Sequence, residues 1–193
     1  MQIKETIKHY PVFEISGYDL PDINFIEQEN DQHSKRIEVT DVSEEFYKQW
    51  NLYGKQIQDF IVDPKLKTNC EEIGVSWFGR NEKFRWDNNY LPKIYIDSPG
   101  FFMDPHIDNR VVFAILIINL QDNPEGTGTQ MLSPFGKTAK TIDEVVYQSP
   151  TQKGTGILMF NNWNTWHKIE NKTDSNRYIA YQTLSIDHLN LQN

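Results

Sequence analysis

From residue 74 to residue 186, short segments rich in β-branched and aromatic residues alternate with turns rich in Gly, Pro and Asn. Many short strands with this punctuation favour a jelly roll or a barrel, so we predict a mainly β fold. The longest connection, residues 134–150, could be a lid over a substrate or a plain surface insertion. The predicted strands cover residues 74–78, 93–97, 106–120, 129–132, 155–161, 165–170 and 177–186.

A helical segment precedes these strands. Asp41 and Glu44 have the spacing of a capping box, which predicts a helix from about residue 43 to residue 62, with Asp63-Pro64 ending it. An apolar stripe on this helix could bind a partner, but such a stripe packs more often on the protein's own sheet. The stripe recurs at helical spacing and consists of Phe46, Trp50, Tyr53, Ile57 and Phe60.

Three residues in two predicted strands have the chemistry of a metal site. His106 and Asp108 are two residues apart, and in an extended segment such residues point to the same side, while Ile107 turns away. With His167 from a distant strand, they make the two-histidine, one-carboxylate set of non-haem iron(II) oxygenases, which leaves positions on iron open. We therefore predict iron binding by these three residues. The alternative for His167 is a buried structural histidine beside Trp166.

Arg177 follows the second histidine by ten residues. A guanidinium group can bind a carboxylate through two parallel hydrogen bonds. The polar turn at residues 171–176 predicts a hairpin that carries His167 and Arg177 on adjacent strands facing one interior. A metal site with a carboxylate anchor suggests an enzyme that binds 2-oxoglutarate on iron. The alternative for Arg177 is a surface strand residue near Asp174.

Three stretches of the chain resemble the prolyl 4-hydroxylase-like branch of the 2-oxoglutarate/Fe(II)-dependent dioxygenase superfamily. YIDSPGFFMDPHIDN, residues 95–109, resembles the start of the catalytic core. FAILIINLQDNPEGTGTQML resembles the hydrophobic strand, acidic loop and Gly-rich entry to the next strand. KGTGILMFNNWNTWHKIENKTDSNRYIAYQTL resembles the closing strands.

The resemblance implies a double-stranded β-helix (jelly roll) with a supporting N-terminal helical segment. Residues 1–193 would form a single catalytic domain. Within it, residues 1–90 would supply N-terminal strands and the supporting helix, residues 91–186 the core with the iron site, and residues 187–193 a C-terminal tail.

The same resemblance assigns roles to individual residues. It implies that His106, Asp108 and His167 ligate Fe(II), and that Arg177 binds the distal carboxylate of 2-oxoglutarate. Tyr95 would hydrogen-bond this cosubstrate. Asn119 and Thr129 are further candidate contacts to 2-oxoglutarate. The set expected to support catalysis is His106, Asp108, His167 and Arg177.

The implied reaction consumes molecular oxygen and 2-oxoglutarate, releases succinate and CO2, and hydroxylates a C–H bond. The substrate would be a peptide residue, with proline the family's usual one, or a small molecule. The chain departs from the family pattern at Thr183, where a tryptophan is common, and at residues 117–119, where a tyrosine is common. A rival prediction is a non-catalytic β-barrel binding module with structural histidines. An iron enzyme without 2-oxoglutarate would leave Arg177 with no obvious task.

Charge and composition exclude several kinds of partner. A net charge of −8 and a pI near 5.1 argue against binding to duplex nucleic acid or to an anionic membrane surface.

The longest apolar run, Val111–Leu120, is too short to span a bilayer. Cys70 is the one cysteine, so no intramolecular disulfide forms. With no apolar signal core near the start, we expect a cytoplasmic protein; the sequence does not indicate its oligomeric state.

Overall fold

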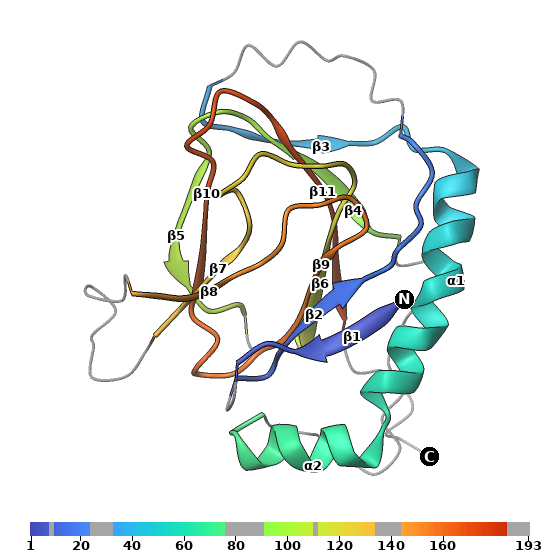
Figure 1. Ribbon diagram of the computed structural model, residues 1–193, viewed down its shortest axis with the longest axis vertical. Helices are drawn as coiled ribbons and strands as arrows, with labels where there is room; N and C mark the ends of the chain where they lie inside the picture. Colours follow the sequence, from blue (N-terminus) through green and yellow to red (C-terminus); the bar gives the residue numbers. More distant parts are fainter. Residues whose placement is uncertain (8–9, 24–32, 76–90, 110–111, 134–143, 185–193) are drawn as a thin grey trace.

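The computed structural model describes residues 1–7, 10–23, 33–75, 91–109, 112–133 and 144–184 (Figure 1). The larger sheet has the spatial order β1 (Gln2–Glu5), β2 (Val12–Ser16), β9 (Gly156–Phe160), β6 (Ala114–Asn119), β11 (Arg177–Leu184), β4 (Lys93–Asp97) and β3 (Arg36–Val39). The smaller sheet has the order β5 (Phe102–His106), β10 (His167–Glu170), β7 (Gln130–Leu132) and β8 (Val145–Gln148). The helices are α1 (Glu44–Ile61) and α2 (Pro64–Glu72).

From β4 to β11 the chain winds back and forth between the two sheets. Strands β4, β6, β9 and β11 lie in the larger sheet, and β5, β7, β8 and β10 lie in the smaller one. Every neighbouring pair is antiparallel. This is the topology of a double-stranded β-helix, so the predicted mainly β jelly roll with a supporting helical segment is confirmed.

Strand β6 forms the centre of two apolar layers, and all six of its residues are buried. Leu116 and Ile118 point into the layer that α1 covers, whereas Ile115 and Ile117 point into the layer between the sheets. Alternation of side chains along a strand produces this division. Burial of each such side chain stabilises the fold by roughly 1.5–3 kcal/mol. The site is built in this inter-sheet layer. Its buried residues are Tyr10, Val12, Ile115, Ile117, Met131, Ile157, Met159 and Ile179.

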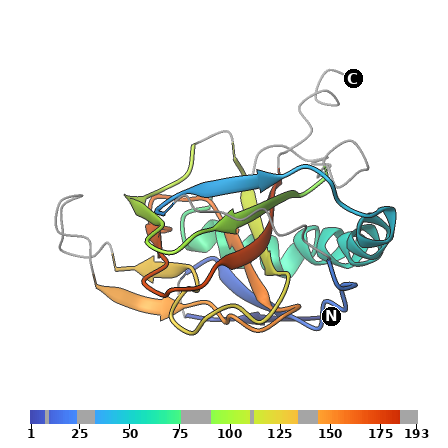
Figure 2. The ribbon, with the colours of Figure 1, turned by 90° about the horizontal axis from the view of Figure 1, so that it is seen from above.

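Helix α1 covers the outer face of the larger sheet, on the side away from β5, β7, β8 and β10 (Figures 1 and 2). Phe46 and Trp50 from the predicted stripe are buried, and the Trp50 Nε1–H donates to Gln182 Oε1 of β11 at 2.7 Å. The predicted packing on the protein's own sheet is confirmed. The predicted capping box is wrong, because Ser43 is the N-cap and its Oγ accepts from the Phe46 N–H. No described helix is long and apolar enough to cross a membrane.

The single strand predicted over residues 106–120 is wrong. Strand β5 ends at His106 and β6 begins at Ala114, and the Val112 N–H donates to the Asn109 carbonyl in a turn between them. The polar residues Asp108 and Asn109, which follow His106 and precede the apolar run, are a sequence signal of this turn that the prediction did not use.

The predicted hairpin is also wrong. Strand β10 pairs with β5 and β7, whereas β11 pairs with β4 and β6, so His167 and Arg177 lie in different sheets. Asn171 holds this crossover, because its side-chain amide donates to the backbone oxygens of Asp97, Ser98 and Ser175.

Two other predicted segments lie partly outside the described residues. The predicted strand at residues 74–78 is described only for Gly74 and Val75, which are not in a strand. The predicted long connection at residues 134–150 contains strand β8, which pairs with β7, so its last part belongs to the smaller sheet.

Candidate metal centre and carboxylate-binding site

The three predicted metal ligands lie together at the end of strand β5. His106 and His167 are register partners in the β5–β10 pair, and their ring centroids are 4.3 Å apart. Asp108 follows in the turn after β5, with its Oδ2 3.6 Å from His167 Nε2. One ligand atom from each residue lies within 4.8 Å of the other two. Two imidazoles and one carboxylate at this spacing can hold a transition-metal ion such as Fe(II).

Backbone carbonyls orient both imidazole rings. Nδ1 of His106 lies 2.7 Å from the Asp104 carbonyl oxygen, and Nδ1 of His167 lies 2.9 Å from that of Thr165. A carbonyl oxygen only accepts hydrogen bonds, so each Nδ1 carries the proton and each Nε2 keeps its lone pair for a metal. Burial lowers the pKa of His167, and His106 lowers it further, while Asp108 raises it. Burial and His106 therefore favour the neutral ring that a metal needs.

Asn161 holds the turn that carries Asp108. Its Nδ2 donates to the backbone oxygens of Asp108, Asn109 and Val112, at 3.2, 2.9 and 3.1 Å. The turn is thereby tied to the residue that follows β9. Sequence reasoning missed this role, since an asparagine far along the chain carries no local sign that it binds another segment's backbone.

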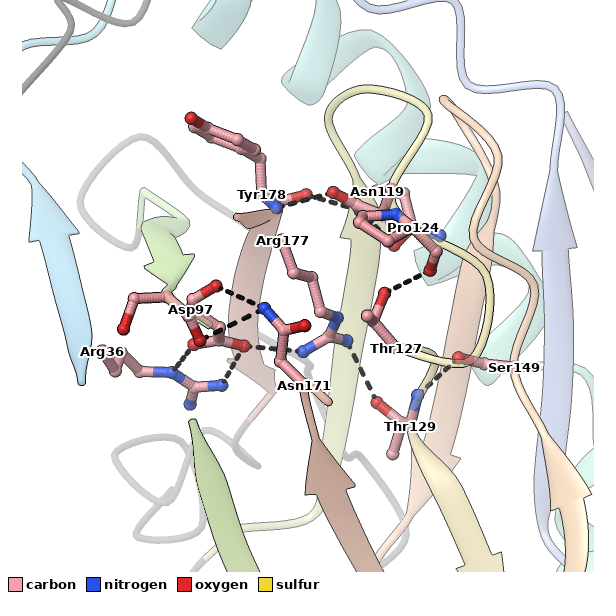
Figure 3. Close-up of polar contacts among 12 residues, drawn as sticks. Arg36, Asp97, Asn119, Pro124, Thr127, Thr129, Ser149, Asn171, Arg177 and Tyr178 are labelled. Carbon is pink, nitrogen blue, oxygen red and sulfur yellow. Dashed lines mark hydrogen bonds and ion pairs between the residues drawn. The ribbon is translucent and has the colours of Figure 1, made fainter. Parts of the chain in front are cut away.

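Arg177 lies inside the protein, where it is 1% exposed (Figure 3). Its Nη1 donates to Asp97 Oδ2 at 2.8 Å, and its Nη2 donates to Thr129 Oγ1 at 3.3 Å. Among the described residues, its Nε has no hydrogen-bond partner. The alternative of a surface arginine near Asp174 is thus wrong. Burial lowers the pKa of Arg177, Asp97 raises it, and Arg36 lowers it.

Asp97 and Arg36 complete this network and were not among the predicted site residues. The Asp97 carboxylate is fully buried and accepts from Arg36 Nε at 2.6 Å and Nη2 at 2.9 Å. The Arg36 guanidinium lies 4.8 Å from the Tyr95 ring centroid and 4.7 Å from that of Phe101. An aspartate within a predicted strand was the one available signal, because a buried carboxylate needs a cationic partner.

The donors of this network fit a carboxylate ligand. A buried N–H without a partner costs free energy, and Arg177 Nε is such a group. Thr129 Oγ1 accepts from Arg177, and among the described residues no acceptor is seen for its own hydrogen. An incoming carboxylate could accept from both groups.

The network and the metal ligands share the inter-sheet layer. Thr129 lies two residues before Met131 of β7, which is the register partner of His167. Arg177, Ile179 and Tyr181 are alternate residues of β11, so their side chains point to the same face of the larger sheet. Ile179 and Tyr181 contribute to the inter-sheet layer. Burial raises the pKa of Tyr181 to about 12, and Asp108 is the largest charged contributor to that shift.

Tyr95 and Asn119, the other predicted contacts to 2-oxoglutarate, have different surroundings. Tyr95 packs against the inter-sheet layer, and its ring centroid is 5.9 Å from that of Tyr181, a second phenol that sequence reasoning missed. Asn119 Nδ2 donates to the carbonyls of Pro150 and Thr155, and its Oδ1 accepts from Asn123. These bonds give Asn119 a role in holding loops, and its contact to 2-oxoglutarate stays a prediction.

No family model and no curated protein matches the chain. Among solved structures, it is similar to a viral collagen prolyl hydroxylase from Paramecium bursaria Chlorella virus-1 in a 2OG complex (17% identity, 90% of this chain and 94% of that chain covered, TM-score 0.48). It is also similar to a Pseudomonas putida prolyl-4-hydroxylase (11% identity, 91% of this chain and 92% of that chain covered, TM-score 0.49). A third similar structure is a Bordetella pertussis cupin domain (15% identity, 59% of this chain and 99% of that chain covered, TM-score 0.30). At these identities and TM-scores, the likenesses do not decide the activity of this chain.

Proposed function

We propose that this protein is an Fe(II)- and 2-oxoglutarate-dependent oxygenase that hydroxylates a C–H bond. One observation carries the proposal: a buried arginine with an unpaired Nε lies in the same inter-sheet layer as a His-Asp-His cluster. An unpaired buried donor costs about 1–3 kcal/mol, and a ligand carboxylate that accepted from this Nε would remove that cost. The proposed metal ligands are His106, Asp108 and His167, and the proposed anchor is Arg177.

The residues divide the work of binding. The two Nε2 atoms and the Asp108 carboxylate would hold the metal from one side, leaving its other side open toward the inter-sheet layer. Arg177 would bind the distal carboxylate of 2-oxoglutarate with help from the Thr129 hydroxyl, and Tyr95 would donate a hydrogen bond to the same molecule. When bound, Fe(II) and 2-oxoglutarate supply the activation of molecular oxygen, with succinate and CO2 as by-products.

Apolar side chains of the inter-sheet layer exclude water around these groups. Ile117, Met131 and Ile179 are each at most 4% exposed. A dry environment strengthens the pairing of Arg177 with a carboxylate.

We propose a peptide residue or a small molecule as the substrate. Strand β5 is an edge strand among the described strands, and an extended peptide can pair with such an edge. Phe102 and Ile107, at and just beyond the two ends of β5, are 48% and 38% exposed and could contact apolar side chains of a peptide. These features favour the peptide.

Thermal unfolding with and without ligands tests the proposal against the rival, a binding module with structural histidines. A ligand that binds only the folded state at 100 times its Kd stabilises it by about 2.7 kcal/mol. We expect 2-oxoglutarate to raise the Tm of the metal-loaded protein and to have little effect on the metal-free protein. The rival predicts no stoichiometric metal and no shift with 2-oxoglutarate in either form.

A further inference from the structure

We propose that Arg36 and Asp97 are positioning residues that leave Arg177 with one uncompensated positive charge for a ligand carboxylate. This inference rests on the proposed function. Neither Arg36 nor Asp97 needs to touch the ligand. Asp97 would orient the guanidinium of Arg177, and Arg36 would prevent Asp97 from neutralising it.

The three residues form one row across three strands. Asp97 on β4 is the register partner of Arg36 on β3 and also of Arg177 on β11. Cross-strand partners on one face of a sheet have side chains close enough to interact. Figure 3 shows the Asp97 carboxylate between the two guanidinium groups, with Arg36 bound through two nitrogens and Arg177 through one.

The charges in this row do not balance. Two guanidinium groups and one carboxylate carry a net charge of +1, and Asp97 is fully buried while the side chain of Arg36 is 18% exposed. A buried charge requires a partner of opposite sign. Binding one further carboxylate would make the row neutral. Without Arg36, Asp97 and Arg177 would already be neutral together, and a ligand carboxylate would add an uncompensated negative charge to the row.

The hydrogen bonds also determine which edge of Arg177 remains available. Asp97 engages Nη1 and Thr129 engages Nη2, while Nε is unpaired. The Nε–Nη2 edge of a guanidinium can bind a carboxylate with two parallel hydrogen bonds. Arg36 already binds Asp97 in this side-on manner. Asp97 therefore occupies Nη1 and not the Nε–Nη2 edge of Arg177, where Nε is unpaired among the described residues and Nη2 has a second hydrogen beside the one that Thr129 accepts.

Calorimetric titration of 2-oxoglutarate into the Fe(II)-loaded protein without oxygen tests this role of Arg36. We expect Arg36→Met to weaken binding by on the order of tenfold to a hundredfold, the effect of a unit charge over several ångströms at an effective dielectric constant of about 20. The double variant Arg36→Met/Asp97→Asn returns the row to a net charge of +1. We expect it to bind 2-oxoglutarate more tightly than Arg36→Met alone.

The matched control is Lys55→Met, which removes one cation from an exposed ion pair with Asp59 on α1. It changes the net charge equally and should leave the affinity unchanged. Wild-type affinity in Arg36→Met would overturn the inference, as would a double variant that binds no better than Arg36→Met, because a purely structural role predicts that outcome. If Arg36→Met does not fold, Arg36→Gln replaces it. Absence of 2-oxoglutarate binding to the wild type would instead refute the proposed function itself.

Discussion

His106 and His167 face each other as register partners of the β5–β10 pair, with their ring centroids 4.3 Å apart. Two of the three candidate metal ligands are therefore positioned by the backbone hydrogen bonds of one antiparallel ladder. The third, Asp108, lies in a turn and depends on the bonds that Asn161 makes to that turn.

Replacing His167 with alanine should abolish tight Fe(II) binding, since two ligands cannot form the facial set. The measurement is metal content per chain after anaerobic loading and desalting. The control is His33→Ala, at an exposed histidine outside the cluster, which should load as the wild type does. Equal iron content in both variants would show that His167 is not a ligand.

Replacing Arg177 with methionine should weaken 2-oxoglutarate binding by about 2–5 kcal/mol and leave iron loading intact, because a buried carboxylate would lose its charged partner. The dissociation constant on the Fe(II)-loaded protein measures this loss. Arg177→Lys keeps the charge without the planar fork, so an intermediate affinity is expected. An unchanged dissociation constant in Arg177→Met would place the anchor elsewhere.

The fold was predictable where local pattern decides the structure. The apolar residues of β6 and the helical spacing of Phe46 and Trp50 each identify one element, and both elements formed, although β6 begins at Ala114 and not at residue 106. Asp108 and Asn109 mark the turn after His106 in the sequence, but the prediction continued one strand through them. The crossover after β10 was mistaken for a hairpin because its polar residues have the composition of any turn.

The site was predictable for residues whose chemistry is unusual in a strand. His106, Asp108 and His167 come together as the spacing suggested, although Asp108 does so from a turn. The partners of Arg177 could not be found in this way. Asp97 is 80 residues from Arg177 and 61 residues from Arg36, so their contacts arise only from the order of strands in the sheet.

Replacing Asn161 with aspartate should weaken metal binding without removing a ligand. The carboxylate would face the three backbone oxygens that the amide now binds, and the turn that carries Asp108 would shift. Loss of a group that orients a metal ligand typically costs about 10–100-fold in affinity. Competition with a chelator measures the metal affinity. Asn176→Asp, in the turn before β11, is the control, and equal affinities in both variants would contradict the assigned role.

The Cys70 thiol should resist modification in the folded protein and should make stability depend on alkaline pH. Burial, and to a smaller extent Glu5 and Glu71, raise its pKa from 9.0 to about 12. Below pH 9 the thiol is neutral in both the folded and unfolded states. Above pH 9 only the unfolded state loses the proton, so the free energy of unfolding should fall by on the order of 1 kcal/mol at pH 10.

Denaturant unfolding at pH 8 and pH 10 measures this dependence. Cys70→Ala should show a smaller decrease between the two pH values, because the titrating group is absent. An equal decrease in the wild type and in Cys70→Ala would mean that other groups cause it. A thiol reagent should react slowly with the folded wild type at pH 8 and rapidly once the protein is unfolded.

The visible absorbance of the Fe(II)-loaded protein during anaerobic addition of 2-oxoglutarate tests the central claim most directly. A cosubstrate that chelates iron held by His106, Asp108 and His167 should produce a metal-to-ligand charge-transfer band that saturates at one equivalent per chain. The band should be absent in His167→Ala and should require more 2-oxoglutarate in Arg177→Met. Stoichiometric iron binding with no band at saturating 2-oxoglutarate would contradict the account.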